Sequence, residues 1–151
     1  MWYRIFCRAS DAPTPADLLE HLHAAGLPAV GHFRGDDLGW TAAEILLGPG
    51  SPVYVERFLT KEDDLRHDLN TWAGFLETCD YSPNHVMLME RVIQSAQMIT
   101  ARKPIDHADE ITTDRLCLVL SQFLAAKTDG IYQIDADGWY TATGELLLKE
   151  Y

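Results

Sequence analysis

The sequence predicts an α+β fold in which a mainly antiparallel sheet is packed by three to four helices. The chain has 151 residues and 47% of them are hydrophobic, which is enough for one continuous core. Strand-like segments come in runs joined by turn residues, and helical periodicity fills the stretches between those runs. No Pro-rich or Gly/Ser-rich linker divides the chain, so we expect residues 1–151 to form a single domain.

The first two elements are predicted to be a strand and a helix. Residues 1–8 interrupt apolar side chains with two arginines, lack the continuous apolar segment of a secretory signal and favour a strand. Thr14 can act as an N-cap, Pro15 suits the first helical position, and Asp17 is placed to complete a capping box. These signals predict a helix over residues 15–25.

The next stretch, residues 29–59, is predicted to be an antiparallel meander. Three strand-like segments are separated by clusters of Gly, Pro and Asp, which are turn-forming residues. The three segments are residues 29–34, 40–47 and 53–59.

A second helix is predicted to follow the meander. The segment Thr60-Lys61-Glu62-Asp63 has the composition of a capping box. Apolar side chains behind it recur at helical spacing, at Leu65, Leu69, Trp72 and Leu76.

Residues 83–101 permit two interpretations. Several β-branched residues favour a strand, whereas apolar side chains gather on one side of a helical projection. We predict a helix. If the segment is instead a long strand, it joins the main sheet and extends the antiparallel topology by one member.

The chain is predicted to close with a buried helix and a hairpin. Residues 113–127 are apolar over most of a helical circumference, which indicates the most buried helix. Strand-like segments at residues 131–135 and 139–143 each follow an Asp-Gly pair, which predicts a hairpin. A third short strand is predicted at residues 146–148. This N-terminal strand, meander and C-terminal hairpin together give the predicted sheet.

Charge and composition limit the classes of partner. Twenty-three acidic and twelve basic residues give a formal net charge of −11, which opposes binding to nucleic acid and anionic lipid. We expect a basic or neutral protein partner; the alternative is that the charge serves only to keep the protein soluble. No apolar run approaches the roughly 20 residues of a membrane span, so no membrane insertion is expected. Three dispersed cysteines without metal or disulfide spacing favour a cytoplasmic protein.

One polar cluster raises the possibility of chemistry. Asp63 and Asp64 lie four and three residues before His67, so on a helix they can share a face and hold a divalent metal. Acids in the first turn of a helix are also what its dipole favours. We therefore predict that these residues and Asp68 stabilise the helix, and we expect no cofactor and no metal.

No catalytic, nucleotide-binding or metal motif stands out elsewhere in the sequence. Trp139 and Tyr140 are candidate binding-surface residues, because exposed aromatic side chains often carry binding energy. The leading hypothesis is a non-catalytic binding or regulatory domain. The alternatives are a small metal-dependent hydrolase with a dispersed His/Asp site, and a structural subunit that forms a homo-oligomer through an uncovered sheet edge.

Overall fold

The fold is built around one antiparallel sheet. The computed structural model describes residues 1–61, 63–106 and 109–151. Within these ranges the elements are β1 (Trp2–Cys7), α1 (Pro15–Ala24), β2 (Val30–Asp36), β3 (Gly39–Leu46), β4 (Val53–Leu59), α2 (Leu65–Glu77), α3 (His85–Ile93), β5 (Gln97–Arg102), α4 (Glu110–Lys127), β6 (Gly130–Ile134), β7 (Gly138–Thr141) and β8 (Leu146–Lys149).

The eight strands formed by the described residues lie in the order β2-β3-β4-β5-β1-β6-β7-β8, and each neighbouring pair is antiparallel. The N-terminal strand therefore lies in the middle of the sheet, between β5 and β6. The predicted meander corresponds to β2–β4, and the predicted C-terminal hairpin with its third short strand corresponds to β6–β8. The expected α+β fold is confirmed.

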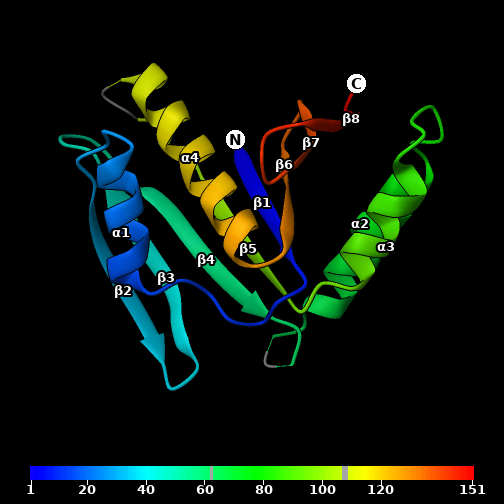
Figure 1. Ribbon diagram of the computed structural model, residues 1–151, viewed down its shortest axis with the longest axis horizontal. Coiled ribbons are helices and arrows are strands. Elements are labelled where there is room, and N and C mark those ends of the chain that lie inside the picture. The colour runs from blue at the N-terminus through cyan, green and yellow to red at the C-terminus, as the bar shows by residue number, and fades with distance from the viewer. Residues whose placement is uncertain (62, 107–108) are drawn as a thin grey trace.

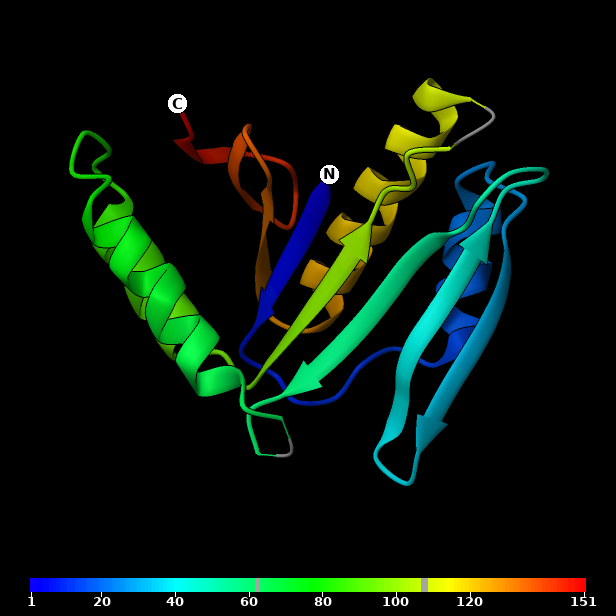
Figure 2. The same cartoon turned by 180° about the vertical axis from the view of Figure 1, so that it is seen from behind.

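The helices cover the two faces of the sheet unequally. α1 and α4 lie together on one face (Figure 1). α2 and α3 form a hairpin on the opposite face, where their apolar side chains pack against β1, β5 and β6–β8. Seen from behind, no described helix crosses in front of β2, β3 and β4 (Figure 2). We call this uncovered side of the sheet the open face.

Two apolar cores result from this arrangement. The larger lies beneath α1 and α4 and includes the fully buried Ile5 and Leu120. The smaller lies beneath the α2–α3 hairpin, where Trp139 is fully buried and stacks on Phe6 with ring centroids 5.1 Å apart. Trp139 therefore offers no surface to a partner, because its strand turns this ring toward the helices. No helix in the described part of the chain is both long and apolar enough to span a bilayer.

Residues 83–101 contain both a helix and a strand, the two structures between which the sequence pattern is ambiguous. α3 ends at Ile93, and β5 begins at Gln97. The prediction of one helix is therefore wrong for the second half of the segment. β5 lies between β4 and β1 and is buried on both faces of the sheet, so its apolar side chains do not alternate with polar ones. The missing alternation explains why the strand resembled part of a helix.

The two predicted helix caps have different outcomes. Thr14 caps α1, because its Oγ1 accepts a hydrogen bond from the Asp17 amide at 3.1 Å. Thr60 does not cap α2. Its amide and hydroxyl both donate to the Ala96 carbonyl, at 3.1 and 3.0 Å, so this residue continues the contact between β4 and the segment before β5. The N-cap of α2 is Asp64, without a side-chain hydrogen bond, and Glu62 lies outside the described residues.

Strand β2 forms one edge of the sheet and is largely exposed. The pairing of β2 with β3 shifts register between Arg34 and Gly35. A Cβ at Gly35 would lie 2.3 Å from the Gly39 carbonyl oxygen, so the close approach of the strands at this bulge requires glycine. A bulge and charged side chains oppose pairing of an edge strand with a second copy. The predicted homo-oligomer stays a prediction.

Candidate binding groove on the open face

The open face carries a cross-strand series of arginine and aromatic side chains. Trp2, Arg102 and Tyr54 are register neighbours in β1, β5 and β4. The Arg102 guanidinium carbon lies 5.5 Å from the Trp2 ring centroid and 5.7 Å from that of Tyr54. Arg34 extends the series from β2 by donating to the Tyr54 hydroxyl at 3.2 Å. The rings of Trp2 and Tyr54 therefore already make cation–π contacts with Arg102.

A cleft of about 210 Å³ lies where the open face meets α2. Its aromatic and thioether side chains form apolar walls, and two carboxylates bring negative charge into it. We call the following set the cleft: Trp2, Arg4, Glu56, Phe58, Asp68, Met98 and Thr100.

Arg4 brings positive charge into the cleft, but this charge is compensated. Its Nη1 forms an ion pair with the Asp135 carboxylate and donates to Gln133 Oε1 at 3.0 Å. The guanidinium carbon also lies 4.8 Å from the ring centroid of Trp72 on α2. Arg4 is thus held by β6 and α2 and does not pair with the cleft carboxylates.

Glu56 has no comparable partner. Its side chain is half-buried on β4, and its register neighbours are Ala42 of β3 and Thr100 of β5, neither of which is a cation. Among the described residues, no hydrogen-bond donor or cation contacts the carboxylate of Glu56 or that of Asp68. Partial burial of a carboxylate without a partner is unfavourable. The cleft therefore retains uncompensated negative charge.

A second hollow, of about 240 Å³, continues the cleft along β4. Glu56 and Phe58 line both hollows, and the second also reaches Asp36, Asp63 and Arg57. The Arg57 guanidinium donates to Gln97 and to main-chain carbonyls. Asp36 accepts a hydrogen bond from the Leu38 amide at 2.8 Å. We call the two hollows together the groove. The groove consists of two successive hollows lined by four acidic residues and two arginines, and this arrangement suits an extended basic chain better than a compact ligand.

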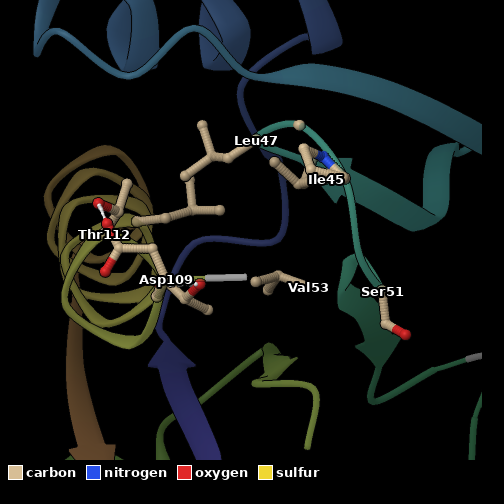
Figure 3. Close-up of a pocket in the computed structure, with 10 residues that line it drawn as sticks. Ile45, Leu47, Ser51, Val53, Asp109 and Thr112 are labelled. Atoms are coloured by element: carbon tan, nitrogen blue, oxygen red, sulfur yellow. Dashed lines mark hydrogen bonds between the residues drawn. The ribbon is translucent and has the colours of Figure 1, made fainter. Parts of the chain in front are cut away.

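A further pocket, of about 240 Å³, lies between the β3–β4 loop and the start of α4 (Figure 3). Ile45, Leu47 and Val53 give it an apolar wall. On the opposite side, the Thr112 hydroxyl donates to the Asp109 carboxylate, which also accepts from the Ile111 amide at 3.1 Å. These polar atoms are engaged in capping α4. The pocket therefore points less clearly to a ligand than the groove does.

The residues singled out as a metal candidate lie around the start of α2. Asp63 accepts a hydrogen bond from the Leu59 amide at 2.9 Å, so its carboxylate stabilises the turn before the helix. Asp64 and His67 are exposed. The described residues contain no group of three or more His, Cys, Asp or Glu side chains that could hold a metal ion. Because the neighbouring Glu62 lies outside them, the metal hypothesis stays a prediction with its own test.

The remaining candidates for binding or chemistry have structural roles. Tyr140 is half-buried, stacks on Tyr132 with ring centroids 5.2 Å apart and donates to Asp137 at 2.6 Å. Its place on a binding surface stays a prediction. Burial raises the pKa of the Cys7 and Cys117 thiols to about 12, so both are protonated at neutral pH and are poor nucleophiles.

The fold and the groove together describe an α+β domain in which one sheet face is left uncovered over β2, β3 and β4 (Figure 2) and carries a predominantly acidic, aromatic-walled groove at the border of that region. No family model matches the chain, and none of the curated proteins or solved structures compared with it matches either. The chemistry of the groove is therefore the basis for a function.

Proposed function

We propose that this protein is a non-catalytic binding domain that holds a basic segment of a protein partner in the groove. The observation that carries this proposal is the half-buried carboxylate of Glu56, which contacts no cation or hydrogen-bond donor among the described residues. A lysine ammonium or an arginine guanidinium from the partner supplies the missing charge. Charge-assisted hydrogen bonds in a partly dehydrated cleft are stronger than those on an open surface.

The walls of the cleft suit the rest of a basic side chain. Trp2 and Phe58 present aromatic surface, and the alkyl stem of lysine or arginine packs well on such surface while its charged end reaches a carboxylate. The volume of about 210 Å³ is below the roughly 300–1,000 Å³ typical of small-molecule pockets. The cleft therefore suits one anchoring side chain, and the second hollow suits the neighbouring residues of the same segment.

Net charge supports the same partner at long range. A protein of charge −11 attracts a basic partner during diffusional encounter and repels polyanions such as nucleic acid. The three cysteines are all buried and none forms a disulfide, which supports the proposal that the protein works in the reducing cytoplasm.

Fluorescence anisotropy tests this proposal with a labelled peptide rich in lysine and arginine and a second peptide in which glutamate replaces the basic residues. Only the basic peptide should bind. Glu56→Gln should weaken binding at least about tenfold, because a charged partner loses its buried counterion. Glu44→Gln is the matched control, since Glu44 is an exposed acid of β3 that does not line the groove. If both variants weakened peptide binding equally, the loss of affinity would come from the change in net charge alone, and this result would contradict the proposed site.

A further inference from the structure

A second charged cluster lies where β1, α3 and α4 end, away from the groove. Arg8 follows β1, Arg91 is in the last turn of α3, and Asp129 joins α4 to β6. The Nε and Nη2 atoms of Arg8 each donate to one carboxylate oxygen of Asp129 at 2.9 Å. This hydrogen-bonded contact lowers the pKa of Asp129. The carboxylate of Asp129 is therefore engaged by Arg8.

Arg91 contacts the main chain of Asp129 rather than its carboxylate. Its Nη2 donates to the main-chain carbonyl of Asp129 at 3.1 Å, and its Nε is buried without an acceptor. No carboxylate among the described residues forms an ion pair with it. Burial lowers the pKa of Arg91 and the nearby positive charge of Arg8 lowers it further, whereas the negative charge of Asp129 partly opposes this shift. Two guanidinium groups thus share one carboxylate, and the excess charge is half-buried.

A pocket of about 320 Å³ adjoins Arg91. Most of its wall is apolar, formed by Met87, Ala125, Ala126, Ile131, Ala142 and Leu147. Thr141 and Thr143 also line it, with their hydroxyl oxygens 3.0 Å apart. Asp129 lines the pocket as well, with its carboxylate paired to Arg8. The pocket therefore combines the Arg91 cation, a carboxylate already neutralised by Arg8, two hydroxyl groups and a hydrocarbon surface.

We propose that this pocket binds a small organic carboxylate with an apolar body, whose carboxylate pairs with Arg91. The planar guanidinium matches a carboxylate in shape and charge. Thr141 and Thr143 share one hydrogen bond, so one of their two hydroxyls is left as a further donor. The apolar wall favours an organic anion over a hydrated inorganic one, because only the former buries hydrocarbon surface there. This site is separate from the groove and of opposite charge preference.

Calorimetric titration of the full chain with octanoate tests the site, with octylammonium and inorganic phosphate as comparison probes. Octanoate should bind saturably, and the other two should not. Arg91→Gln should weaken octanoate binding at least about tenfold. Arg66→Gln is the matched control, because the exposed Arg66 likewise donates to a main-chain carbonyl, that of Ile93 at 2.8 Å, but does not line the pocket.

A filling variant keeps the test decisive if Arg91→Gln fails to fold. Ala126 lies at an exposed position of α4, where leucine is well tolerated, so Ala126→Leu should fold and should abolish octanoate binding by occupying the pocket. Absence of octanoate uptake by the unaltered protein would overturn the proposal. Equal affinity for octylammonium, or unchanged octanoate affinity in Ala126→Leu, would overturn it as well.

Discussion

Truncation of Leu120 tests the packing of α4 on the sheet. Leu120 is fully buried in the larger core, and Leu120→Ala removes three carbon groups from it. At ~0.8 kcal/mol per buried group, the lost transfer free energy is roughly 2.4 kcal/mol. The cavity left behind raises the total to about 3–4 kcal/mol. For a chain of this length, that loss corresponds to a fall in Tm of about 6–16 °C.

Leu118 provides the matched control on the same helix. It lies two residues away and is 37% exposed, so Leu118→Ala should destabilise by about 1 kcal/mol or less. Urea denaturation of the two variants and the unaltered protein, followed by circular dichroism, measures both values. Equal midpoints for the two variants would refute the burial pattern on which the larger core rests.

Three further predictions concern single groups. Thr60→Ala should lower the free energy of unfolding by about 1 kcal/mol, because it removes the hydrogen bond from the Thr60 hydroxyl to the Ala96 carbonyl. Circular dichroism should show no shortening of α2, since Thr60 does not cap this helix. The contact with Arg8 lowers the pKa of Asp129 in the folded protein. The stability that this contact gives is therefore present above the unfolded pKa of about 4 and is lost as the pH falls through the lower pKa of the folded state. Asp129→Asn should flatten this part of a pH–stability curve, and an unchanged slope would contradict the contact. Zinc and manganese titrations should show no saturable uptake at micromolar metal, whereas tight uptake abolished by His67→Ala would favour the metal-dependent hydrolase.

Local signals in the sequence predicted most elements of the fold. The Thr14 cap and the apolar circumference of α4 are properties of neighbouring residues, and both predictions are confirmed. The errors arose where partners distant in sequence decide the structure. Thr60 has the local setting of a cap, but it binds Ala96, which lies 36 residues later. Trp139 has the composition signal of a surface anchor, but in the structure the α2–α3 hairpin covers its ring.

The candidate groove was harder to predict from the sequence than the fold. Nothing in the sequence around Glu56 distinguishes this residue from an ordinary solvent-facing acid of a strand. Its distinction comes from register, which places Ala42 and Thr100 beside it rather than a cation. Strand order and register depend on long-range pairing, so a short sequence window contains no signal for them.

The most direct test of the proposed groove is an NMR titration with the basic peptide that follows the indole N–H signals of the four tryptophans. Trp2 lines the cleft, whereas Trp40 belongs to the core on the opposite face, and its indole donates to the Pro13 carbonyl at 2.9 Å. Saturable movement of the Trp2 signal with a stationary Trp40 signal is the predicted result, and Glu56→Gln should suppress that movement. Peptide binding that leaves the Trp2 signal in place would contradict the assignment of the groove as the binding site.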